Sequence, residues 1–149
     1  MCGISGIFNR KGEHVWTTNL EKMNQALAHR GPDDSGVFSE NGIALGHRRL
    51  SIIDLSAAGH QPMFYDNGRY TLVYNGELYN YRELKAEMAD VEFKTATDSE
   101  VILAAYSRWK ELCLQKFNGM FAFAIWDETE KKLFIARDRL GIKPLYYWF

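Results

Sequence analysis

The chain has 149 residues, of which 46% are hydrophobic, and its 18 basic and 19 acidic residues leave a net charge of −1. This length suggests one domain with a sizeable core, and the charge balance argues against binding to nucleic acid or to an anionic membrane. We expect no membrane span and no signal peptide, because no apolar run approaches ~20 residues and no basic segment precedes one. The two cysteines, Cys2 and Cys113, make neither a disulfide scaffold nor a metal site, and the histidines lack metal-ligand spacing, so a cytoplasmic location is expected.

Apolar periodicity and turn residues predict several antiparallel strands with helices between them. In chain order, we expect a strand at 2–9, a helix at 17–29, hairpins at 37–53 and 64–74, helices at 80–89 and 97–109, a hairpin at 120–138 and a final strand at 144–149. The hairpins are expected to turn at Asn41-Gly42, at Asn67-Gly68 and around residues 128–131. Nothing repeats strand–helix–strand as a parallel sheet would, so the order predicts an α+β fold.

Cys2 directly follows the initiator methionine and begins an apolar segment spaced by glycines. One interpretation is a small buried strand residue, because free cysteines are among the most buried residue types. The other is a nucleophile. A small second residue lets the methionine be removed, and an α-amine, with a pKa of roughly 7.7–8.0, can then accept the proton of an adjacent thiol, with a pKa of about 8.5.

Asn75-Gly76 follows the apolar segment "YTLVY" and precedes a predicted helix, so we expect it at the end of a strand. An Asn amide and the following Gly N–H could together hold a developing oxyanion at such a place. The alternative is an ordinary turn, which is the commoner use of this dipeptide.

Arg48 and Arg49 should lie on opposite faces of their strand, because side chains alternate. The inward one needs a partner, which could be a protein carboxylate or the carboxylate of a ligand. Glu77 and Asp98 stand beside predicted helix starts, where Asp98 or Ser99 could be an N-cap. The other role of these acids is to bind an ammonium group, and a cavity with one arginine and two acids would fit a free amino acid.

Several motifs together resemble the glutaminase domain of class II glutamine amidotransferases, with glutamine-hydrolysing asparagine synthetase as the branch most similar. The segments that carry the resemblance are "MCGISGIF", "AHRGPDDSG", "GHRRLSIIDLSAAGHQPM", "YNGELYNYREL", "TDSEVILAAY", "GMFAFAIWD" and "ARDRLGIKPLYY". They run from the first residue almost to the last, in family order, so the resemblance covers residues 1–149 as one domain.

The resemblance implies an αββα sandwich of the N-terminal nucleophile hydrolase type, in which two antiparallel sheets lie between helical layers. It implies that Cys2 is the nucleophile, and that Asn75 and the N–H of Gly76 form the oxyanion hole. Arg49 would hold the α-carboxylate of glutamine, and Glu77 and Asp98 would contact its α-amino group. The strand that lines the site would be Leu50, Ser51, Ile52 and Ile53. The implied reaction converts glutamine to a γ-glutamyl thioester and ammonia, and water then releases glutamate.

Two departures from the family pattern concern what this chain lacks. It has no SGGxDS-type pyrophosphate loop, so ATP and Mg are expected only in a synthetase domain or subunit that uses the ammonia to make asparagine from aspartate. The family pattern continues after "GIKPLYY", so we expect a C-terminally truncated domain whose open edge favours self-association, for example as a homodimer. The competing interpretations are a non-catalytic glutamine-binding or subunit-interaction fragment, and an asparagine-synthetase-like amidotransferase with another acceptor.

Overall fold

The structure, a computed structural model, describes residues 1–40, 42–52 and 56–149. Its first sheet is antiparallel and contains β1 (Gly3–Phe8), β3 (Ile43–Arg49) and β2 (Asp34–Glu40) in this spatial order. The predicted first strand is confirmed, and so is the first hairpin, since Glu40 and Ile43 are partners across the turn. The second strand of this hairpin ends at Arg49, so the expectation that Leu50, Ser51 and Ile52 belong to a strand is wrong. Asn41, one of the two expected turn residues, lies outside the described residues.

The second sheet is also antiparallel, and its four strands follow each other in chain order. They are β4 (Met63–Tyr65), β5 (Tyr70–Leu78), β6 (Gly119–Asp127) and β7 (Lys132–Arg137). Both predicted hairpins are confirmed. The first turns through Asp66, Asn67 and Gly68, which all have positive φ, a backbone region that Asn and Gly tolerate best.

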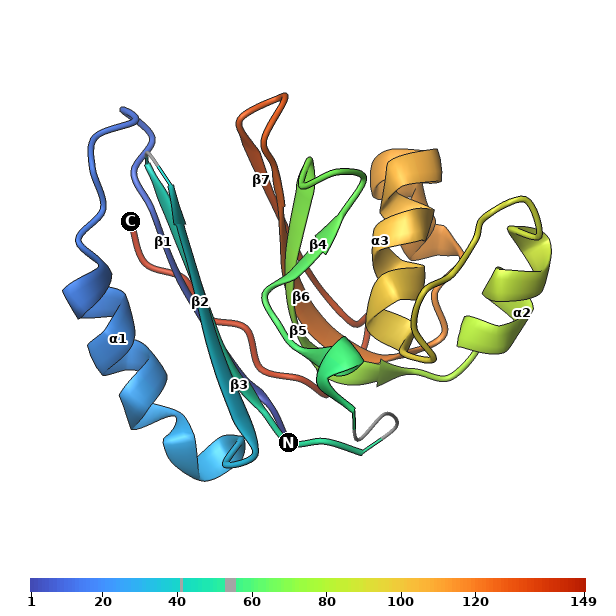
Figure 1. Cartoon of the computed structure of the whole chain (residues 1–149), viewed down its shortest axis with the longest axis horizontal. Helices are drawn as coiled ribbons and strands as arrows, with labels where there is room; N and C mark the ends of the chain where they lie inside the picture. Colours follow the sequence, from blue (N-terminus) through green and yellow to red (C-terminus); the bar gives the residue numbers. More distant parts are fainter. Residues whose placement is uncertain (41, 53–55) are drawn as a thin grey trace.

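Helices cover the outer face of each sheet (Figure 1). On the first sheet lies α1 (Thr17–Ala26), which continues into the short helical turn η1 (Ala28–Arg30). On the second sheet lies α3 (Asp98–Trp109), with α2 (Tyr81–Glu87) beside it and the turn η3 (Lys110–Gln115) after it. The layers therefore run helix, sheet, sheet, helix, which confirms the αββα sandwich. None of the described helices is both long and apolar enough to cross a membrane.

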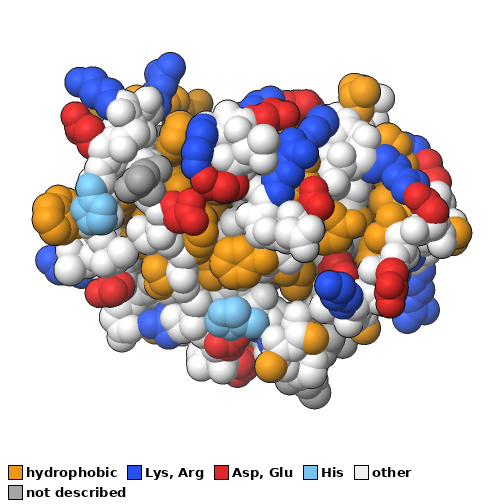
Figure 2. All heavy atoms as spheres, turned by 45° about the horizontal axis from the view of Figure 1, so that its top comes forward, with side chains coloured by type: hydrophobic (Ala, Val, Ile, Leu, Met, Phe, Trp, Pro, Cys, Tyr) orange, Lys and Arg blue, Asp and Glu red, His pale blue; other side chains and the backbone are white. Residues whose placement is uncertain are grey.

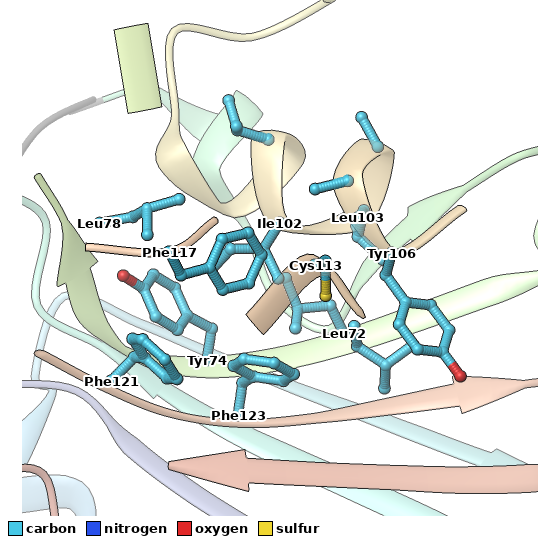
Figure 3. Packing of buried hydrophobic residues seen from close by; sticks show 14 of the residues in the cluster. Leu72, Tyr74, Leu78, Ile102, Leu103, Tyr106, Cys113, Phe117, Phe121 and Phe123 are labelled. Atoms are coloured by element: carbon cyan, nitrogen blue, oxygen red, sulfur yellow. The ribbon is translucent and has the colours of Figure 1, made fainter. Parts of the chain in front are cut away.

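The alternation of side chains along β5 divides the core into two parts. Residues with even numbers, such as Leu72 and Tyr74, point toward α3 and pack with helix and sheet side chains such as Phe123 (Figure 3). Residues with odd numbers point toward the first sheet, where Val73 packs against Leu45 of β3. A polar side chain at an odd position of β5 therefore lies between the two sheets.

Other details also differ from the sequence-based expectation. Residues 144–149 form no strand, and Tyr146 and Trp148 are more than 90% exposed. A strand needs a neighbour that accepts and donates main-chain hydrogen bonds, and none of the described strands pairs with this segment. The N-cap of α3 is Thr97, whose side chain accepts the N–H of Glu100, rather than Asp98 or Ser99. The helix expected at 17–29 ends at Ala26 and gives way to η1.

The surface carries both signs of charge. Figure 2 shows Lys and Arg side chains interspersed with Asp and Glu over the face in view.

Candidate active site

The N-terminus, the end of β3 and the short turn η2 (Ala57–Gly59) lie near one another at one end of the sandwich (Figure 1). Residues from all three line a pocket there. Most of the residues predicted for the site line this pocket: Cys2, Arg49, Leu50, Ile52, Asn75, Gly76, Glu77 and Asp98. Ser51 instead lines a neighbouring hollow, and its N–H bonds to the carboxylate of Asp33 at 2.8 Å. Ile53 lies outside the described residues.

Cys2 precedes β1, and the end of β3 holds its side chain. Its Sγ accepts the N–H of Leu50 at 3.4 Å and lies 3.7 Å from the Leu50 carbonyl oxygen. The main-chain carbonyl of Cys2 accepts a hydrogen bond from Nε of Arg30 at 3.1 Å. The side chain is neither fully buried nor fully exposed. The thiol is therefore fixed in place yet reaches the pocket, which a purely structural core cysteine would not do.

The open edge of β5 supplies hydrogen-bond donors to the pocket. Odd-numbered residues of β5 exchange main-chain bonds with β6, as the neighbouring bond from Tyr79 N–H to the Asn118 carbonyl shows. Even-numbered residues therefore face the other edge, which β4 covers only as far as Leu72. Beyond β4, side chains take over: Tyr74 N–H donates to Oε1 of Gln61 at 2.7 Å, and Leu78 N–H donates to Oδ2 of Asp98 at 2.9 Å.

Gly76 lies between Tyr74 and Leu78, whose N–H groups are both bonded to side chains. No described residue accepts its N–H, which is therefore available to a ligand in the pocket. The residue must be small, because a Cβ here would lie 2.3 Å from the Met120 carbonyl oxygen. Its neighbour Asn75 is at an odd position, so its amide points between the sheets toward the pocket, and the side chain is 4% exposed.

The expectation that Asn75-Gly76 marks the end of a strand is wrong. Both residues lie within β5, which continues to Leu78. The donors are available because β4, the neighbouring strand, is short and ends before it reaches them. Such a gap depends on contacts between distant segments and has no local sequence signal.

Asp98 lies in the first turn of α3 and is held by two donors. Its Oδ2 accepts the hydroxyl of Tyr74 at 2.8 Å as well as the N–H of Leu78. Burial raises the pKa of Asp98 above its usual value, while these two hydrogen bonds counteract the rise. Burial and the neighbouring Asp98 carboxylate together raise the pKa of Tyr74 well above 10, so the phenol stays a donor.

Arg49 is the last residue of β3, and its side chain lies on the face of the strand that faces the second sheet. The residue is 8% exposed. Its Nη1 donates to the carbonyl of Ser56 at 2.8 Å. The guanidinium packs directly on Gly59, where a Cβ would lie only 2.0 Å from Nη2, so a larger residue here would displace the guanidinium. Arg48 points the other way and donates to the carbonyl of Asn24 on α1 at 3.0 Å. The predicted opposite orientation of the two arginines is confirmed.

An acid and a histidine lie beside Arg49. Asp34 is its register partner on β2, and the carboxylate of Asp34 bonds to Nδ1 of His60 at 2.7 Å. Burial disfavours the charge on Asp34, but hydrogen bonds from His60 and from the N–H of Ser35 outweigh this and lower its pKa. The carboxylate therefore stays ionised near the guanidinium.

Sequence reasoning missed several residues of the site, among them Arg30, Gln61, Tyr74 and Lys143. All four lie within the quoted motifs, but no periodicity marks them as functional. Lys143 is 4% exposed, lines the pocket and places its Nζ 2.9 Å from Sδ of Met1. Burial of a lysine is unusual, but burial cannot be read from a single sequence.

Comparisons with known proteins give one answer for the family. A family model described as a glutamine amidotransferase domain matches residues 1–148. The chain is 44% identical to asparagine synthetase (glutamine-hydrolysing) 3 of Bacillus subtilis, over 99% of this chain and 25% of that protein. It is 41% identical to asparagine synthetase B (glutamine-hydrolysing) of Escherichia coli, over 98% of this chain and 26% of that protein. The chain thus spans about a quarter of the length of these curated relatives.

The solved structure of glutamine phosphoribosylpyrophosphate amidotransferase from B. subtilis, in complex with ADP and GMP, has the same fold. It superposes with a TM-score of 0.80 at 21% identity, over 97% of this chain and 38% of that one. Sequence motifs, fold and family model therefore agree that the chain belongs to the glutamine amidotransferase domain family.

Proposed function

We propose that this chain hydrolyses the side-chain amide of L-glutamine and supplies the ammonia to a synthetase domain or subunit that makes asparagine from aspartate and ATP. One observation carries the proposal. The Cys2 thiol, the open N–H of Gly76 and the Arg49 and Asp98 side chains all reach a single pocket. The relatives named as glutamine-hydrolysing asparagine synthetases support the choice of acceptor.

In this proposal, one end of the pocket binds the amino-acid part of glutamine. Arg49 binds the α-carboxylate, because a planar guanidinium can donate two parallel hydrogen bonds to it. Asp98 and Glu77 bind the α-ammonium group. Oδ2 of Asp98 already has two protein donors, which orient the carboxylate before a substrate arrives. Leu50 and Ile52 also line the pocket.

The other end of the pocket carries the chemistry. Once Met1 is removed, the α-amine of Cys2 accepts the thiol proton, and the thiolate attacks the amide carbon of glutamine. The oxyanion that forms accepts hydrogen bonds from Gly76 N–H and from the amide of Asn75. The protonated amine then gives its proton to the departing nitrogen, so that ammonia leaves and a thioester forms. Water attacks the thioester, releases glutamate and regenerates the thiol.

This half-reaction requires only glutamine and water, so ATP and Mg are assigned to the synthetase domain or subunit. We assign the reaction to the cytoplasm, because both cysteines are free thiols and thiols persist in reducing compartments.

Ammonia release from glutamine, measured on protein whose N-terminus has been sequenced, tests the proposal. Chain that begins at Cys2 should release ammonia and glutamate in equal amounts, and Cys2→Ala should release neither while still binding glutamine. Processed wild-type chain that binds glutamine without turnover would contradict the proposal and favour a glutamine-binding module.

A further inference from the structure

The side chain of Gln61 joins the two parts of the site. Gln61 lies between η2 and β4 and is 5% exposed. Its Oε1 accepts Tyr74 N–H of β5 at 2.7 Å, and its Nε2 donates to Oγ of Ser99 on α3 at 3.2 Å. Tyr74 is next to Asn75 in the chain, and Ser99 is next to Asp98. One amide therefore links the strand that carries the oxyanion donors to the helix that carries the ammonium-binding acid.

The register of the sheet explains why a side chain, and not a neighbouring strand, accepts the N–H of Tyr74. Met63 of β4 pairs with Leu72 of β5. If β4 continued upstream in the same antiparallel register, Gln61 would face Tyr74 and Gly59 would face Gly76. The Gln61 backbone instead packs on the first sheet, since a Cβ on Gly36 would lie 2.1 Å from the Gln61 carbonyl oxygen. Its side-chain amide takes the place of the missing strand at Tyr74.

This replacement keeps the next position on the edge open. Gly59 packs on the Arg49 guanidinium, and the described pairing of β4 with β5 stops at Met63, before it reaches Gly59. A strand that continued as far as Gly59 would pair with Gly76 and occupy its N–H. The Gln61 side chain thus satisfies the buried N–H of Tyr74 without covering the N–H two residues further along.

We infer that Gln61 is a positioning residue for glutamine hydrolysis. Its side chain keeps the N–H of Gly76 open and fixes the position of this N–H relative to Asp98. This inference rests on the proposed function. Gln61 acts through its two partners, one on each side of the site. The bond to Tyr74 controls the oxyanion donors and hence the maximal rate. The bond to Ser99 controls the start of α3 and hence the binding of glutamine.

Two variants separate these effects. Gln61→Met has a similar length but loses both bonds, so we expect kcat to fall by about ten- to a hundredfold. This is less than the ~100–1,000-fold loss on removing an oxyanion donor, because the Gly76 donor is displaced and not removed. Ser99→Ala loses only the bond to α3, so we expect a raised KM and a kcat within about twofold of wild type. Leu84→Ala, at a buried position of α2, is the control for lost stability.

Amide hydrogen exchange provides a readout that does not depend on turnover. Exchange at Tyr74, whose N–H loses its acceptor, should speed up more in Gln61→Met than in Leu84→Ala. A normal kcat in Gln61→Met, or a kcat that falls equally in Leu84→Ala, would overturn the inference. If Gln61→Met does not fold, an unchanged KM in Ser99→Ala would also overturn it. If processed wild-type chain releases no ammonia, the proposed function fails. In that case, unaltered amide hydrogen exchange at Tyr74 in Gln61→Met would separately reject the inference about Gln61.

Discussion

Acid should destabilise this fold through His47, which lies on β3 between the two sheets and is fully buried. Its Nε2 is 3.0 Å from the carbonyl oxygen of Tyr74, so this nitrogen must carry the hydrogen. Its Nδ1 has no hydrogen-bond partner among the described residues. Protonation would therefore place a charge and an unsatisfied N–H in the core.

Burial lowers the pKa of His47 from an ordinary 6.5 to about 4, although the bond to Tyr74 opposes the change. Between these two values the unfolded chain binds a proton at this site and the folded chain does not. The free energy of unfolding must therefore decrease as the pH falls from 6.5 to about 4. At about 1.4 kcal/mol per pH unit, the loss comes to roughly 3 kcal/mol, a large fraction of the 5–15 kcal/mol typical of a domain.

Denaturant unfolding between pH 4 and pH 7.5 measures this effect when wild type is compared with His47→Gln. Asp34 and Asp98 also have shifted pKa values, one lowered and one raised. Both are present in the two proteins, so their contributions cancel in the difference. The free energies of wild type and His47→Gln should diverge by about 3 kcal/mol across the window, whereas the exposed-site variant His29→Gln should parallel wild type. Parallel curves for wild type and His47→Gln would refute the argument.

Four further outcomes follow from the site. A residue inserted before Cys2 should abolish hydrolysis and preserve glutamine binding; full activity in protein shown by mass spectrometry to retain the insertion would exclude the free-amine mechanism. Asn75→Ala should lower kcat by ~100–1,000-fold with a smaller effect on glutamine binding, and wild-type turnover at an unchanged melting temperature would exclude a catalytic role. Arg49→Lys keeps the charge but loses the paired geometry, so the apparent KM for glutamine should rise by roughly ten- to a hundredfold; an unchanged KM would rule out the carboxylate contact. The exposed aromatic residues at 146–149 should make the chain self-associate, to a homodimer or beyond, and a monodisperse monomer in light scattering would contradict this.

Much of the fold could be predicted because local patterns carry it. Alternating and apolar segments indicated the hairpins, two of them separated by Asn-Gly turns and the third by the polar residues 128–131, and the structure pairs their strands as expected. Residues 144–149 were the exception, since a strand-like composition produces no strand without a partner. The position of the α3 cap was also wrong, because Thr97 and Asp98 are both good capping residues and only the backbone chooses between them.

The sequence by itself determined which side chains share a face, because a strand alternates with a period of two. This alternation sufficed to place the side chains of Arg48 and Arg49 on opposite faces of their strand. The family motifs indicated Cys2 and Asn75 as site residues. Only the tertiary structure decided which amide of β5 stays open. That choice depends on where β4 ends and on the Gln61 side chain that replaces it. Hydrogen bonds between segments distant in the chain form only when the sheets and α3 pack together, so no local pattern of residues encodes them.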